Sequence, residues 1–169
     1  RRKDTQFVAV CDVQQARRDA GKRVVDDYNQ NADCRAYHDF REVIARPDID
    51  AVSAATPAHW HALVPISAAR AGKHVILEKP IALNWEDCLE VQKAVQAAKV
   101  RTCVCFECRF SSQMRTIKAF IERGLLGRIH YGEVDYYHGI GPSYNQYRWN
   151  IRQDSGGSSL LSAGCHALS

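Results

Sequence analysis

Short apolar runs alternate with helical patterns along residues 7–106, and this alternation constrains the fold more than any other feature. The apolar runs have the length of strands, and the stretches between them have helical spacing or composition. The runs lie at 7–11, 49–55, 74–77 and 102–106, and the helical stretches at 14–28, 39–45, 60–71 and 85–98. Short connections make a parallel α/β sheet the economical arrangement. The run 7–11 shows no alternation, which is typical of a strand buried on both faces.

Capping residues mark several helix boundaries. Asp39 precedes one helical stretch, with Glu42 as its capping-box partner, and Asn84 precedes another. Gly72 follows a third stretch, where a left-handed residue commonly ends a helix. Ser111-Ser112 is expected to cap a further helix that ends at Gly124.

The character of the chain changes after about residue 108. Residues 129–138 are rich in tyrosine and alternate loosely, which predicts a strand with one solvated or ligand-facing side. An aromatic loop is expected at 139–150 and a flexible joint at 155–159. This part resembles the start of a second unit, more antiparallel than the first.

Composition indicates a soluble globular protein. The chain has 169 residues, of which 46% are hydrophobic and 25% charged. A dispersed net charge of +4 gives no support to nucleic-acid binding, and no apolar run has the length of a membrane span. Seven scattered cysteines are typical of free thiols in a reducing compartment, so we expect a cytoplasmic protein.

The tripeptide Glu78-Lys79-Pro80 follows the apolar run 74–77 directly. Open α/β sheets bind ligands beyond the carboxyl ends of their strands, so these charges would face a ligand. Lys79 can donate a hydrogen bond to a substrate oxygen, Glu78 can hold the ammonium, and Pro80 restricts the backbone before it. The alternative is a strand end with an ordinary solvated salt bridge.

Five segments, in order, resemble the Gfo/Idh/MocA oxidoreductases (glucose-fructose oxidoreductase, inositol dehydrogenase and the rhizopine-catabolism proteins). They are Val8-Ala9-Val10-Cys11-Asp12; Tyr37-His38-Asp39-Phe40 with 46–52; Ala55-Thr56-Pro57-Ala58-His59-Trp60-His61; 71–75 with Glu78-Lys79-Pro80; and 157–166. The resemblance implies a Rossmann-like parallel sheet followed by an α+β domain. It also implies NAD(P)-dependent hydride transfer between nicotinamide and a hydroxyl carbon of a sugar or polyol.

No GxGxxG turn occurs in the sequence. Under the resemblance, residues 1–108 would be a partial NAD-binding Rossmann domain without its first strand and Gly-rich loop. Residues 109–169 would begin the substrate-binding domain. We therefore expect the isolated chain to bind cofactor weakly, and the full-length protein to be a homo-oligomer.

The resemblance assigns cofactor contacts. Asp12 would accept the ribose hydroxyls and disfavour a 2′-phosphate, which favours NAD over NADP, although Arg17 and Arg18 could soften this preference. The loop after the second long apolar run would follow the nicotinamide side of the cofactor. Its residues are Thr56, Pro57, His59, Trp60 and His61; for His59 and Trp60, plain packing at a helix start is an equal alternative.

The catalytic residues implied are Lys79 and His166. Lys79 would bond the substrate hydroxyl and share in proton transfer, with Glu78 and Pro80 at the cofactor side, and His166 would act as general base. A structural histidine is the alternative at 166. The family pattern has an aspartate where this chain has Ser162. Arg109 would contact cofactor, although Glu107 and Cys108 depart from the usual Asn-Arg-Arg-Phe segment.

We expect no metal site. Cys105 and Cys108 have CxxC spacing, but no second pair or histidine lies at zinc-site distance in the sequence. Cys103 and Cys105 would share a strand face as small buried hydrophobes. Two other functions stay open: NAD-dependent glycoside cleavage, and a non-catalytic ligand-sensing regulator.

Overall fold

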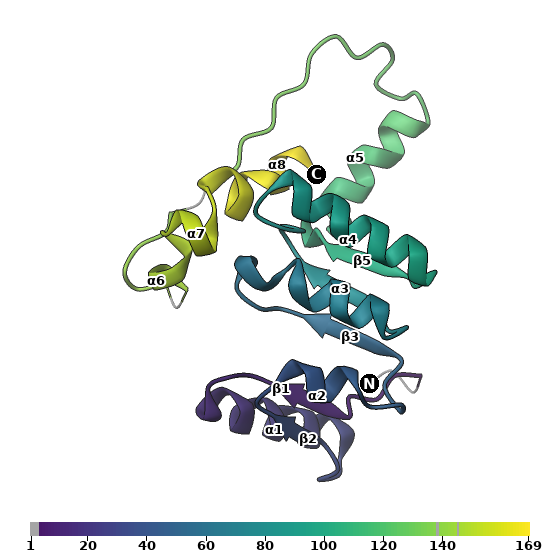
Figure 1. Ribbon diagram of the computed structural model, residues 1–169. Coiled ribbons are helices and arrows are strands. Elements are labelled where there is room, and N and C mark those ends of the chain that lie inside the picture. The colour runs from purple at the N-terminus through teal and green to yellow at the C-terminus, as the bar shows by residue number, and fades with distance from the viewer. Residues whose placement is uncertain (1–3, 138, 145) are drawn as a thin grey trace.

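A computed structural model describes residues 4–137, 139–144 and 146–169 (Figure 1). Two parallel sheets carry the strands. In one, β1 (Ala9–Cys11) pairs with β2 (Arg35–Tyr37). In the other, the order is β3 (Ala51–Ala54), β4 (His74–Glu78) and β5 (Thr102–Cys105). The predicted parallel α/β arrangement is confirmed, although the three-residue β2 was not predicted.

Helices connect and follow the strands. They are α1 (Gln15–Asn29), α2 (Phe40–Ile44), η1 (Ala58–Trp60), α3 (Leu63–Arg70), α4 (Trp85–Ala98), η2 (Glu107–Phe110), α5 (Ser112–Glu122), α6 (Tyr147–Asn150), α7 (Gln153–Gly156), the π-helix η3 (Leu160–Gly164) and α8 (Cys165–Leu168). Within the described ranges, no helix is long and apolar enough to span a membrane.

The predicted caps form. The Asn84 side chain accepts a hydrogen bond from the backbone N–H of Asp87, and Ser111 accepts one from Met114. Asp39 caps α2, but its oxygen accepts from Arg41 and not from Glu42. Both the second and third amides of a helix are open to such a bond, so either partner satisfies the cap.

One apolar core lies between the β3–β5 sheet and helices α2 and α3. Its buried residues are Ile44, Ala54, Val64, Ala68, Val75 and Leu77. Leu77 is completely buried. This core fixes the ends of β3 and β4, where the expected functional residues begin.

The β3–β5 sheet is buried on one face only. The expectation that the run 7–11 is buried on both faces is wrong, because Ala9 and Val10 in β1 are half-buried and Cys11 is exposed. In β4, Val75 and Leu77 are 1% and 0% exposed, whereas Ile76 between them is 45% exposed. Cys103 on β5 is also exposed, so the prediction that it packs in the core is wrong. Successive side chains point to opposite faces, and helices of the described residues cover just the face of Leu77.

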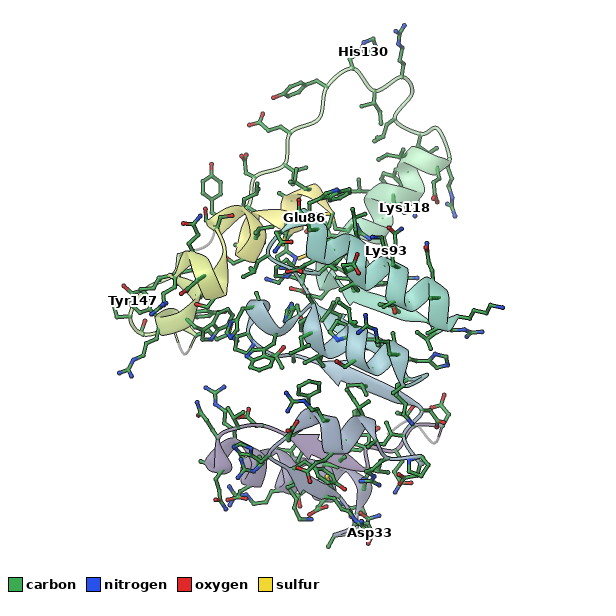
Figure 2. All side chains as sticks on the ribbon, viewed as in Figure 1. Asp33, Glu86, Lys93, Lys118, His130 and Tyr147 are labelled. Carbon is green, nitrogen blue, oxygen red and sulfur yellow. The ribbon has the colours of Figure 1, made fainter. Side chains whose placement is uncertain are left out.

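Residues 129–137 form no strand, which corrects a second expectation; His138 lies outside the described residues. The segment arcs away from the domain, and His130 at its apex points outward (Figures 1 and 2). Tyr131 and Tyr137 are 78% and 92% exposed. A strand needs a hydrogen-bonded neighbour, and no described residue provides one here. Helix α6 occupies the end of the expected aromatic loop, and α7 overlaps the start of the expected flexible joint.

Candidate active site

The candidate site lies at the carboxyl ends of β3 and β4. Thr56 follows β3 closely, and Lys79 follows β4 directly. Helices α7 and η3 lie beside this edge (Figure 1), and α7 contacts η1. Residues near 56 and 79 come together because the ends of parallel strands meet at one edge, and residue 162 is brought to them on η3.

Lys79 is anchored to the C-terminal helices. Its Nζ donates a hydrogen bond of 2.5 Å to the backbone carbonyl oxygen of Ser162, in η3. The Lys79–Pro80 peptide bond is cis. Burial raises the pKa of the nearby Cys165 thiol, and the positive charge of Lys79 opposes that rise. The ammonium therefore lies among the residues that lead to His166.

Glu78 does not hold the Lys79 ammonium, contrary to our expectation. No ion pair within 4 Å joins these two described side chains. Glu78 instead acts on Cys105, whose pKa is raised first by burial and then by the Glu78 charge. Consecutive residues at the end of an extended strand point to opposite faces, so Glu78 and Lys79 diverge.

His61 connects the two loops of this edge. It is 2% exposed; its Nδ1 lies 2.6 Å from the Pro80 carbonyl oxygen, and its Nε2 lies 2.7 Å from that of Thr56. Both ring nitrogens therefore face backbone. His61 holds the Lys79–Pro80 turn against the β3 loop and has no ring nitrogen left for a ligand.

His166, on α8, is buried between aromatic rings. The Tyr136 ring stacks on it at 5.3 Å, and Phe106 meets it edge-on at 6.3 Å. Its Nε2 lies 3.6 Å from Glu107 Oε1, and its buried Nδ1 has no hydrogen-bond partner. Tyr136 and Glu107 were not assigned roles from the sequence, because their proximity to His166 depends on contacts across 30 or more positions.

Asp12 lies at the end of β1, half-buried. One carboxylate oxygen accepts a hydrogen bond from the backbone N–H of Gln14 at 2.8 Å. The Arg18 guanidinium donates to the Asp12 backbone carbonyl at 2.7 Å. Arg18, which could have softened the preference for NAD, is thus held to the backbone beside the acid.

The Thr56 hydroxyl is a further polar group at this edge that could bond a nucleotide. Thr56 Oγ1 is buried and has no hydrogen-bond partner. Such an orphaned hydroxyl is costly unless a bound group or water satisfies it. Together with the Asp12 carboxylate, it gives the chain donor and acceptor atoms suited to a dinucleotide.

His59 and Trp60 lie on the outer side of the same loop. The Trp60 ring meets Phe40 edge-on at 6.3 Å and is 37% exposed. His59 lines a shallow hollow of about 390 Å³ together with Arg148, Trp149, Arg152, Asp154 and Ser155. Pro57 precedes η1 as its N-cap.

Arg109 is directed toward the end of α8. Its guanidinium lies over the Phe106 ring at 4.8 Å, and its Nε donates to the Ser169 carbonyl at 3.1 Å. The first contact lies within η2 and its N-cap, and the second links η2 to the residue that ends α8, so Arg109 connects Phe106 to the helix that carries His166.

Gly156 in α7 lies very close to the backbone of Asn150 in α6, which allows the two helices to pack tightly. A Cβ atom at this position would collide with the backbone carbonyl of Asn150. The close approach lets α7 reach η1 beside the site.

Comparison with known proteins agrees with this geometry. Residues 1–106 match the family model described as an oxidoreductase family with an NAD-binding Rossmann fold. The parallel α/β sheet and this match together define the class, an NAD-binding protein of the Rossmann fold. The chain belongs to the Gfo/Idh/MocA family of oxidoreductases, as the resemblance indicated.

Relatives include a levoglucosan dehydrogenase of Pseudarthrobacter phenanthrenivorans, 42% identical over 91 residues, which are 54% of this chain and 23% of the relative. An alpha-N-acetylgalactosaminidase of Shewanella oneidensis is 27% identical over 148 residues, and the match covers 86% of this chain and 31% of the relative. A levoglucosan dehydrogenase solved with NADH and levoglucosan superposes with a TM-score of 0.81 at 27% identity, covering 96% of this chain and 43% of that one. The chain spans less than half the length of these relatives.

Proposed function

We propose that this chain belongs to an NAD-dependent dehydrogenase that oxidises a hydroxyl carbon of a sugar, polyol or related compound. The observation that carries the proposal is the Lys79–Ser162 hydrogen bond. It brings the end of β4 to the helical segment that leads into His166, although the two residues are far apart in sequence. Support comes from the family and from a relative and a structure named as levoglucosan dehydrogenases.

Each residue has a role in this proposal. NAD would supply the hydride acceptor. Lys79 would donate a hydrogen bond to the substrate hydroxyl, in place of its bond to the Ser162 carbonyl. His166 would accept the hydroxyl proton at a ring nitrogen, and its Nδ1 is uncommitted. His61 would position Lys79 by holding the adjoining turn.

The cofactor contacts are proposed on chemical grounds. The Asp12 carboxylate would accept ribose hydroxyls and repel a 2′-phosphate, which favours NAD over NADP. The Thr56 hydroxyl would find a partner on the bound nucleotide. Trp60, Pro80 and Arg109 lie on segments adjoining this edge and would shape its walls. We keep residues 109–169 as the proposed start of a substrate-binding domain, the cytoplasm as the proposed location, and a homo-oligomer as the proposed assembly.

A Lys79→Met variant tests the function. In the full-length protein, supplied with a panel of polyols and NAD⁺, reduced nicotinamide should accumulate in the wild type, and kcat should fall about 10²- to 10⁴-fold in the variant. Lys93→Met is the matched control, because Lys93 forms a surface ion pair with Glu90. Unchanged kcat in Lys79→Met would contradict the role of the ammonium.

The glycosidase relative motivates a second candidate, cleavage of a glycoside through transient oxidation. The same assay separates the two functions. A dehydrogenase accumulates reduced nicotinamide in proportion to product, whereas the glycosidase route releases sugar and accumulates no reduced nicotinamide. A ligand-sensing regulator would show neither, and would keep its partner interaction in Lys79→Met.

A further inference from the structure

Glu107, Cys108 and His166 form a cluster that their positions in the sequence do not suggest. The first two belong to η2 and the third to α8. One ligand atom from each lies within 4.8 Å of the others. The His166 side chain is 3% exposed and that of Glu107 is 68% exposed, so the cluster has a buried side and an open side.

The three donor types are those that zinc prefers. Zinc is bound by cysteine sulfur, histidine nitrogen and carboxylate oxygen in a tetrahedral arrangement, with Zn–N near 2.0–2.1 Å and Zn–S near 2.3 Å. Tetrahedral ligands at such lengths lie about 3.3–3.6 Å from one another. His166 Nε2 and Glu107 Oε1 are 3.6 Å apart, within this range. Calcium and magnesium prefer oxygen ligands alone.

The state of His166 is a second, independent indication of a ligand. The Nε2 that faces Glu107 makes no hydrogen bond to a described residue, because the 3.6 Å contact is too long for one, and the buried Nδ1 has no partner either. Tyr136 and Phe106 hold the ring between them, so its orientation is set by packing. A core histidine with a purely structural role would have its ring nitrogens satisfied, as those of His61 are.

We propose that Glu107, Cys108 and His166 bind a zinc ion, with a fourth position open to water. The thiol proton is released to solvent as the Zn–S bond forms, and no redox change occurs. A neutral imidazole has one lone pair. An imidazole bound to zinc therefore cannot accept a substrate proton, and zinc would reversibly prevent His166 from acting as the general base. This consequence rests on the proposed function; the binding itself does not.

Cobalt(II) serves as the spectroscopic probe. Titration of the intact wild-type protein should produce a near-ultraviolet sulfur-to-cobalt charge-transfer band and visible bands of tetrahedral cobalt, and zinc should remove both. Cys108→Ser should abolish the charge-transfer band. Cys105→Ser is the matched control, since its sulfur lies outside the cluster, and it should retain the band.

Isothermal titration calorimetry with zinc measures how much the other ligands contribute to zinc affinity. Glu107→Gln should weaken zinc binding at least about tenfold, the scale that loss of even an outer-shell partner produces. Glu107 is exposed, so this variant should fold even where His166→Gln does not. Absence of the wild-type band, or equal zinc affinity in wild type, Glu107→Gln and Cys108→Ser, would overturn the site. If zinc binds but leaves dehydrogenase turnover unchanged, the site stands and the role of His166 as base fails.

Discussion

His61 and Pro80 are joined through a contact of 2.6 Å between the imidazole Nδ1 and the proline carbonyl oxygen. The opposite nitrogen of the same ring faces the Thr56 carbonyl. One buried side chain therefore determines how the loop after β3 lies relative to the turn that carries Lys79. The placement of Lys79 depends on a residue that our proposal keeps away from substrate.

Replacing His61 tests whether its contacts to the Pro80 and Thr56 carbonyl oxygens stabilise the fold. His61→Ala should lower the free energy of unfolding by about 1–3 kcal/mol, because buried carbonyls lose their hydrogen-bond partner. Urea unfolding followed by circular dichroism would measure it. His59→Ala, two positions earlier and exposed, should change stability little. Equal losses in the two variants would show that the His61 contacts contribute nothing specific.

Neighbouring residues of β4 test the one-sided core. Leu77→Ala should lower stability by about 2–5 kcal/mol, because Leu77 is wholly buried and truncation leaves a cavity. Ile76→Ala removes a side chain that is 45% exposed and should have a much smaller effect. The comparison holds strand and position nearly constant, so a large effect of Ile76→Ala would mean that its face is covered in solution.

The cap of α4 offers a local test. Asn84→Ala removes the acceptor for the Asp87 backbone N–H, a bond of 2.8 Å. Stability should fall by about 1 kcal/mol. Gln92→Ala, on the exposed surface of the same helix, should be nearly neutral in the same denaturant titration. No difference between the two would mean that the cap does not form.

Arg152 and Asp154 give a test by pH. The Arg152 guanidinium makes two hydrogen bonds to the Asp154 carboxylate, of 3.0 and 2.6 Å, and lowers the pKa of Asp154 from 3.8 to about 2. A lowered native pKa stabilises the fold above the ordinary pKa of the carboxyl, and this stabilisation is lost as pH falls toward 2.

Carboxyl NMR titration would measure that pKa directly. In Arg152→Gln the pKa of Asp154 should return toward 3.8, whereas Lys93→Gln should leave it unchanged. An Asp154 titration that is the same in wild type and Arg152→Gln would refute the pairing.

Much of the fold followed from local sequence. The apolar run 74–77 gave β4, and Asn84 and Ser111 gave helix starts, because these signals act over a few residues. The missing strand at 129–137 shows the limit: tyrosine alternation is compatible with a strand, but pairing requires a neighbour. Similarly, the exposure of Cys103 depends on which sheet face the helices cover.

The site was predictable where a motif sits at a strand end and unpredictable where partners are distant. Lys79 follows β4 as expected, but its contact with the Ser162 carbonyl spans 83 positions. The approach of Cys108 to His166 depends on how α8 packs on η2, which spacing along the chain does not reveal. His61 was expected beside the cofactor, and only the structure shows both ring nitrogens occupied by backbone.

The tight contact between Gly156 and the Asn150 carbonyl has a consequence for variation at this position. Even alanine would push α6 and α7 apart and disturb the neighbouring loop at η1. A saturation library selected for folded protein should return glycine almost alone at 156, whereas Gly132, with open space around it, should accept a broad range of side chains.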